Sequence, residues 1–121
     1  MADKSVASSY VREARRVRNL LFQVRDWKVT TSIITYELGY MIRQLFYADV
    51  YPARAEGHRL QAKSDIIDVI TQIEALCQDM VWDFDELRIQ GAEKFLERMK
   101  QIQAQRAGGD TSKLQSSEPS S

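Results

Sequence analysis

Three acidic side chains fall on two neighbouring segments that have the apolar period of helices. Glu37 lies in ITYELGYMIRQLFY, residues 34–47, at the edge of a stripe of apolar residues that recur at steps of three and four. Asp65 and Asp68 are three residues apart in a later segment, so they share one side of a helix and can reach a common ion. Mg²⁺ prefers hard oxygen ligands and commonly joins carboxylates to substrate phosphates. The pattern predicts a three-carboxylate metal site, and a solvated helix face is the alternative for Asp65 and Asp68.

Glu37 needs a partner because a carboxylate beside an apolar stripe is costly to desolvate unless it is paired, protonated or bound to a cation. A cation shared with Asp65 and Asp68 meets that need. An arginine or a tyrosine hydroxyl is the alternative partner. Spacing alone leaves both open.

Four segments of helical period position these residues, and no strand-like alternation competes with them. The apolar stripe of the first segment consists of Tyr10, Ala14, Val17, Leu21 and Val24. The stretch RDWKVTTS, residues 25–32, breaks this pattern. Because Thr30, Thr31 or Ser32 can cap a helix by accepting a backbone N–H bond, the second helix is expected to start there and run to about Val50. Its stripe consists of Ile34, Leu38, Met41 and Leu45.

The chain is expected to turn at VYPARAEGH, residues 50–58, because Pro52 lacks an amide proton and disfavours helix at Tyr51. The third helix is clearest from Ser64, with a start upstream near Glu56 left open, and it ends near Val81. Its stripe consists of Ile66, Val69, Ile70, Ile73, Cys77 and Met80. Together with Ile67 and Val81, these residues give the helix more apolar surface than one neighbour covers. A homo-oligomer, a dimer or a tetramer, is therefore expected.

The fourth helix is expected to begin at Asp83, which has capping-box spacing to Glu86, and to fray around QRAGGD, residues 105–110. The closing stretch GGDTSKLQSSEPSS has too little apolar surface to offset its ordering entropy. We expect a flexible N-terminus at residues 1–8, one helical domain at 9–106 and a disordered tail at 107–121. The predicted fold class is all-α, a four-helix bundle.

The composition narrows the class of partner. The 17 Lys and Arg residues balance 17 Asp and Glu residues, which argues against nucleic acid or an anionic membrane as the main partner. Residues 1–28 hold an excess of arginine, either as a solvated helix face or as a basic rim that attracts phosphates. DNA binding rests on these arginines alone and ranks last among the functions considered.

Cys77 is the only cysteine, so an intrachain disulfide and a Cys-rich zinc site are excluded. The N-terminus lacks the layout of a signal peptide, and no apolar run approaches the roughly 18 residues of a membrane span. These features predict a cytoplasmic protein.

A succession of motifs resembles the MazG-like nucleotide pyrophosphohydrolases, a family of the all-α nucleoside triphosphate pyrophosphatase group. The motifs are Trp27, YELGY (36–40), DIIDV (65–69), WDFDEL (82–87) and EKFLER (93–98). The likeness spans roughly residues 15 to 100. Members of this family carry E-x-x-E on one helix and E-x-x-D on the next, and these carboxylates hold Mg²⁺ against the triphosphate.

The resemblance assigns roles position by position. Glu37 matches the first glutamate of E-x-x-E, and Asp68 matches the aspartate of E-x-x-D. Tyr40 stands where the second glutamate belongs, and Asp65 replaces the glutamate of the second motif. Aspartate keeps the charge, whereas tyrosine is neutral near pH 7 and a poor Mg²⁺ ligand.

Three further residues are assigned to substrate by this likeness. Lys94 and Arg98 match the basic segment that helps bind phosphate, with a surface role at a helix end as their alternative. Trp27 packs over a base or covers the end of the bundle.

The resemblance implies metal-dependent hydrolysis, with Mg²⁺ or Mn²⁺, of a nucleoside triphosphate to the monophosphate and pyrophosphate. Glu37, Asp65 and Asp68 are the expected ligands and catalytic carboxylates. Family members build this site within oligomers. The competing hypothesis is a module of the same fold without the hydrolytic activity. In that case Tyr40 marks a lost metal site, and the module serves oligomerisation, nucleotide binding or partner binding.

Overall fold

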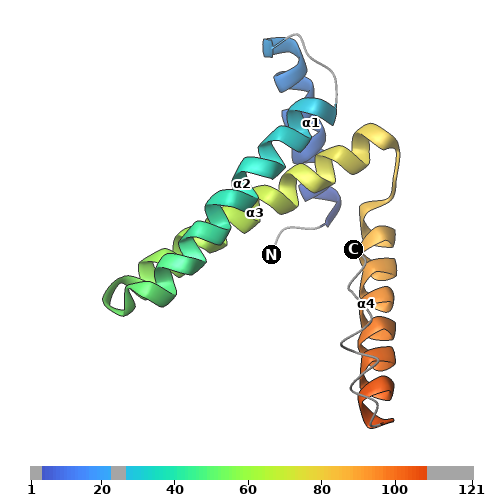
Figure 1. The fold of residues 1–121 in the computed structure, drawn as a ribbon. Coiled ribbons are helices and arrows are strands. Elements are labelled where there is room, and N and C mark those ends of the chain that lie inside the picture. The colour runs from blue at the N-terminus through green and yellow to red at the C-terminus, as the bar shows by residue number, and fades with distance from the viewer. Residues whose placement is uncertain (1–3, 23–26, 109–121) are drawn as a thin grey trace. The chain divides into compact units, whose positions relative to one another are not determined.

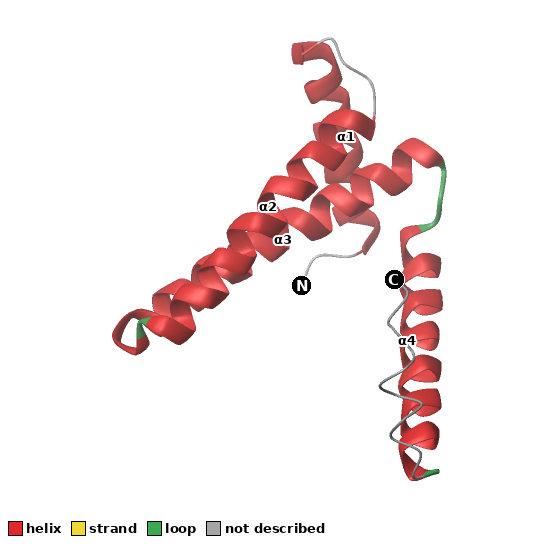
Figure 2. Ribbon diagram, in the orientation of Figure 1, coloured by secondary structure: helices red, strands yellow, loops and turns green. Residues whose placement is uncertain are grey.

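The computed structural model describes residues 4–22 and 27–108, and all regular structure within them is helical (Figure 2). The elements are α1 (Lys4–Phe22), α2 (Trp27–Val50), the short 3₁₀ helix η1 (Pro52–Arg54), α3 (Ala55–Met80) and α4 (Phe84–Ala107) (Figure 1). The predicted all-α class is therefore confirmed for this part of the chain. None of these helices is long and apolar enough to cross a membrane.

The chain divides into two compact units, residues 1–83 and 84–121. The first holds α1, α2, η1 and α3, and the second holds α4. The helix α1 begins at Lys4, inside the segment expected to be flexible, because no helix breaker separates Lys4 from Tyr10 and extending a helix costs less than starting one. Most of the tail expected at residues 107–121 lies outside the described residues.

The helices α2 and α3 lie side by side as a hairpin (Figure 1). The turn is short and local: Tyr51 N–H donates to the Tyr47 carbonyl at 2.9 Å, and Arg54 N–H donates to the Tyr51 carbonyl at 2.9 Å. Pro52 opens η1, where its missing amide proton leaves no helical bond unmade. The turn predicted around Pro52 is confirmed.

The end of α3 is a Schellman motif. Val81 N–H donates to the Gln78 carbonyl at 3.3 Å and Trp82 N–H to the Cys77 carbonyl at 2.8 Å, with Val81 in the left-handed region at φ 59°. Glycine normally takes this position, because a β-branched residue there is strained. The predicted end of the helix near Val81 is confirmed.

The residues between α2 and α3 are mostly small or polar, with Ile34, Met41 and Val69 as the larger apolar ones. On α2 the least exposed positions recur at steps of three and four, as Thr30, Ile34, Glu37, Met41, Gln44 and Ala48. On α3 they include Ala55, His58, Ala62, Asp65, Val69 and Gln72. This is the spacing of two helices that pack along a seam. Two of the three predicted metal ligands, Glu37 and Asp65, therefore lie on the seam itself.

The predicted apolar stripes lie mostly outside this seam. Leu38 and Leu45 on α2, and Ile66 and Ile70 on α3, are each more than a third exposed. Val69 and Cys77 are the residues of the α3 stripe that are buried. The larger apolar side chains outside this seam are therefore not covered by the contact between α2 and α3.

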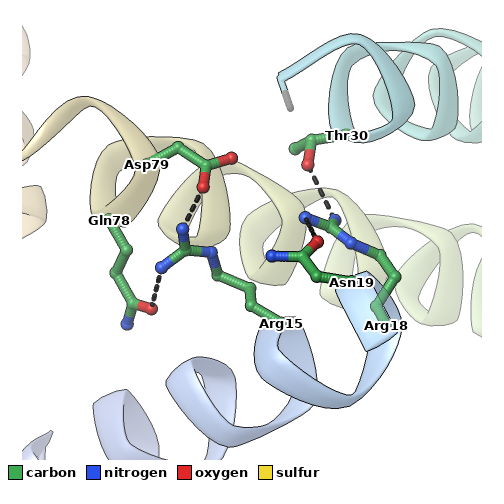
Figure 3. A network of polar contacts seen from close by, with 6 residues as sticks. All are labelled: Arg15, Arg18, Asn19, Thr30, Gln78 and Asp79. Carbon is green, nitrogen blue, oxygen red and sulfur yellow. Dashed lines mark hydrogen bonds and ion pairs between the residues drawn. The ribbon is translucent and has the colours of Figure 1, made fainter. Parts of the chain in front are cut away.

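The helix α1 is held to the hairpin mainly by polar contacts (Figure 3). Arg15 forms an ion pair with Asp79 and donates to the Gln78 side chain at 3.0 Å. Arg18 donates to the hydroxyl of Thr30 at 2.8 Å. The side chains of Tyr10 and Leu21, from the predicted stripe of this helix, are largely exposed. Val24, the last residue of that stripe, lies outside the described residues.

The predicted cap at Thr30, Thr31 or Ser32 is wrong. The helix α2 begins at Trp27, so all three residues lie within it. Thr30 is 0% exposed and accepts the bond from Arg18, a partner 12 residues away in the sequence. The Thr30 hydroxyl therefore bonds to a side chain of α1, whereas the local sequence pattern predicted that it would cap α2.

The second unit is the single helix α4, which begins one residue after Asp83 as the capping-box spacing predicts. Its first turn carries Asp85 and Glu86 and its last turn Arg106, charges that favour the helix dipole at each end. No residue of α4 is buried.

Candidate active site

A hollow in the first unit gathers the three acidic residues that the sequence singles out. Its lining residues from α2 are Glu37, Tyr40, Arg43 and Gln44, and those from α3 are Gln61, Asp65 and Asp68. They come together because Glu37 and Asp65 occupy facing positions of the seam. Asp68 follows Asp65 by three residues and so lies on the same side of α3.

Asp65 is the most deeply placed of the three carboxylates, at 5% exposed. The amide of Gln61, one turn earlier on α3, donates to its Oδ1 at 3.3 Å. Its Oδ2 is buried and has no hydrogen-bond partner. A buried carboxylate oxygen without a partner is costly, and a cation is one group that removes that cost.

Glu37 is half-buried and faces both aspartates. Its pKa is raised above the ordinary value by partial desolvation, then by the negative charges of Asp68 and Asp65, and then by a hydrogen bond with Asp65. Like charges close together disfavour the ionised form. The direction of the shift therefore reflects the desolvation of Glu37 and the repulsion between it and the two aspartates.

Tyr40 forms part of an aromatic and cationic row along α2. Its ring meets that of Tyr36 edge to face, with centroids 5.8 Å apart and planes at 82°. The guanidinium carbon of Arg43 lies 4.9 Å from the Tyr40 ring centroid, within cation–π range. The position where the resembled family has a glutamate thus supports a positive charge.

Within residues 4–22 and 27–108, no three or more His, Cys, Asp or Glu side chains are arranged to hold one metal ion together. Mg²⁺ is often held by only one or two carboxylates, with waters and substrate phosphates completing its shell. The unpartnered Oδ2 of Asp65, with Glu37 facing it, fits that donor set.

The remaining predicted site residues lie elsewhere. Lys94 and Arg98 line a shallow hollow on α4 with Gly91 and Phe95, in the second unit. Trp27 is the first residue of α2 and is about half exposed, with the Lys28 Nζ 6.0 Å from its ring centroid.

Sequence reasoning missed Arg43, Gln44 and Gln61. A signal for each was present in the spacing: Gln44 follows Glu37 by seven residues, Arg43 follows Tyr40 by three, and Gln61 precedes Asp65 by four. Residues at these separations share a helix face, so they line the same hollow as the acids.

The arginines of α1 divide into two groups. Arg15 and Arg18 are partly buried and bonded to α2 and α3, which differs from the solvated face that was one of two interpretations. Arg16 is exposed and pairs with Glu13 on its own helix at 2.6 Å.

Comparison with known proteins gives no assignment. No family model matches this chain, and no curated protein or solved structure is significantly similar to it.

Proposed function

We propose that this chain is a MazG-like nucleoside triphosphate pyrophosphohydrolase that uses Mg²⁺ or Mn²⁺. The observation that carries the proposal is the buried, unpartnered Oδ2 of Asp65 in a hollow shared with Glu37 and Asp68. An unpartnered carboxylate oxygen can ligate a metal ion, and Asp65, unlike Asp79, is not paired with a basic side chain within the described residues. The order of acidic motifs along the sequence supports the same function.

In the proposed reaction, water attacks the α-phosphorus of the triphosphate, and the bond from that phosphorus to the α,β-bridging oxygen breaks. The products are a nucleoside monophosphate and pyrophosphate. A bound divalent ion neutralises triphosphate charge and lowers the pKa of a bound water. Of Glu37, Asp65 and Asp68, one or two would hold the ion, with waters and phosphate completing its shell, and another would accept the proton of the attacking water.

Lys94 and Arg98 are proposed to contact phosphate, and Trp27 to contact the base. Lys94 and Arg98 are four residues apart on one side of α4 and line one hollow, as residues that bind a common anion must. Trp27 offers an exposed aromatic surface at the start of the helix that carries Glu37.

We propose that the chain forms a four-helix MazG-like bundle and that this bundle assembles into a homo-oligomer, a dimer or a tetramer. Large apolar side chains are exposed on both helices of the hairpin, with Ile42 at 63% and Ile67 at 54%. Monomeric proteins rarely leave a large apolar surface open. A second copy of the chain is the simplest cover for it. The cytoplasm stays the predicted compartment.

A second candidate function is a helical module that binds a partner or a nucleotide without cleaving it. Tyr40 favours this candidate, because it replaces a metal-ligating glutamate of the resembled family with a neutral side chain. The same hollow and the same exposed apolar faces are compatible with it. The two candidates differ in turnover.

The test is release of pyrophosphate from a panel of nucleoside and deoxynucleoside triphosphates with Mg²⁺ or Mn²⁺. The variants are Glu37→Gln and Asp68→Asn, and the matched control is Asp49→Asn, an exposed carboxylate on α2 outside the hollow. We expect metal-dependent release in the wild type and the control, and a loss of about 100-fold or more in the two site variants.

Release that is the same in all four proteins would refute the assignment of the site. No release from any substrate, combined with tight nucleotide binding, would favour the non-cleaving module.

A further inference from the structure

The acidic hollow contains one positive side chain among its lining residues, Arg43. This arginine is part of the row on α2 formed with Tyr36 and Tyr40, three residues that are one turn apart in succession. The face of a tyrosine ring attracts a cation, and the edge-to-face contact with Tyr36 supports the ring. The row therefore holds a guanidinium at a hollow that otherwise carries only negative charge.

Arg43 forms no ion pair within the described part of the chain, although three carboxylates line the same hollow. Arg15, on α1, is by contrast paired with Asp79. A guanidinium has five N–H donors and matches the oxygens of a phosphate group in pairs. Arg43 is exposed, so these donors are accessible to an anion from solution.

The charge of the hollow matches one divalent cation. Three carboxylates and one guanidinium give a formal charge of −2, which a single Mg²⁺ neutralises. A second ion would leave an excess of positive charge and would lack the carboxylate that Tyr40 replaces. A phosphate ligand then has two positive groups to bind, the ion and Arg43.

Building on the proposed function, we infer that the hollow binds a diphosphate group together with one divalent cation, and that Arg43, held on the ring of Tyr40, supplies the second positive charge. This is a role for a residue of this chain that the family resemblance does not assign. It explains how the site works with tyrosine in place of a ligand.

Calorimetric titration tests the inference without measuring turnover. Mg²⁺ is titrated first into the full-length protein, and imidodiphosphate, a diphosphate analogue with a P–N–P link, is then titrated at saturating Mg²⁺. The variants are Arg43→Gln and Arg43→Lys, and the control is Arg54→Gln, an exposed arginine in η1 that does not line the hollow.

We expect one Mg²⁺ per chain. Arg43→Gln should weaken imidodiphosphate binding at least about tenfold while Mg²⁺ alone binds as in the wild type or more tightly, since a positive charge has been removed. Arg43→Lys should restore part of the loss because it keeps the charge without the paired geometry. Arg54→Gln should match the wild type.

A second pair of variants tests whether the Tyr40 ring positions Arg43. Tyr40→Phe keeps the aromatic face and should bind imidodiphosphate as the wild type does, whereas Tyr40→Leu should weaken binding. Equal effects of the two would refute the contribution of the ring. All variants lie on exposed positions, and an unchanged helical circular dichroism signal checks their folding.

The outcomes distinguish a failure of the role inferred for Arg43 from a failure of the proposed function. If the wild type binds Mg²⁺ and Arg43→Gln binds imidodiphosphate equally well, this inference fails and the proposed function stands. If the wild type binds no Mg²⁺ at millimolar concentration, both fail. Two Mg²⁺ ions per chain would refute the single-cation site.

Discussion

The helix α3 carries two charged clusters, one around Asp79 and one around Asp65, that differ in how their carboxylates are neutralised. Near its end, Asp79 is neutralised by Arg15, and Gln78 joins the same guanidinium (Figure 3). Near its middle, Asp65 accepts a hydrogen bond from the amide of Gln61 and faces two further carboxylates, Glu37 and Asp68. Both aspartates retain one oxygen without a hydrogen bond. The difference is that Arg15 neutralises Asp79, whereas no basic side chain of residues 4–22 and 27–108 forms an ion pair with Asp65.

The two clusters differ in whether the chain itself supplies the cation that neutralises the carboxylate. A buried or half-buried ion pair that is complete within the chain fixes the position of one helix on another. A buried carboxylate that is incomplete within the chain lowers stability and is retained where an external group completes it. The first cluster therefore organises the unit, and the second is the cluster to which we assign the proposed cation.

Replacing Arg15 should have the largest effect on stability. Arg15→Met keeps an unbranched stem but leaves Asp79 unpaired, with both side chains less than a fifth exposed. We expect a loss of about 2 kcal/mol in the free energy of unfolding. Urea denaturation at a fixed protein concentration measures it, since an oligomer's stability depends on concentration.

The control for that change is Arg16→Met, which breaks the exposed pair with Glu13. Its urea midpoint should stay at the wild-type value, because exposed ion pairs contribute little. If Arg15→Met were no more destabilising than Arg16→Met, the first cluster would not organise the unit.

Replacing Asp65 should have the opposite and smaller effect. Asp65→Asn removes a buried charge while keeping the shape, so the metal-free protein should gain about 1 kcal/mol. Added Mg²⁺ should stabilise the wild type and leave the variant unchanged, since only a protein that binds the ion gains from it. Urea denaturation with and without chelator measures both. A less stable metal-free variant would mean that the carboxylate is already satisfied within the chain.

The pH dependence of Glu37 should give the smallest effect. Because its folded-state pKa is raised, the folded protein holds the proton more tightly than the unfolded chain, and deprotonation lowers stability. Glu37→Gln should therefore be more stable than the metal-free wild type above the raised pKa. This advantage should shrink as the pH falls through that pKa toward the ordinary value of 4.5.

Urea midpoints of the two proteins over a pH series measure that advantage. Glu13→Gln should change stability with pH in the opposite direction, because the hydrogen bond and charge of Arg16 lower the pKa of Glu13. Glu13 therefore contributes stability that is present above its ordinary pKa and is lost as the pH falls through the lowered one. An advantage of Glu37→Gln that stays constant with pH would contradict the coupling of Glu37 to the two aspartates.

The sequence by itself determined where the helices lie. The apolar period, the turn at Pro52 and the capping-box residue Asp83 act within a few residues of chain, so they could be recognised without a structure. The same local reasoning failed at Thr30, where a partner from α1 takes the hydroxyl. It also failed at Lys4, where the helix continues past the expected start.

The tertiary structure decided which face of each helix lies inside the hairpin. The sequence favours the stripe of large apolar residues, yet only part of each stripe lies where α2 and α3 meet. Small and polar side chains fill most of that seam, and Leu38, Leu45, Ile66 and Ile70 stay exposed. That choice buries Asp65 beside Glu37 and brings Arg43 into the same hollow. It also joins Arg15 to Asp79, 64 residues away, a contact that no local pattern encodes.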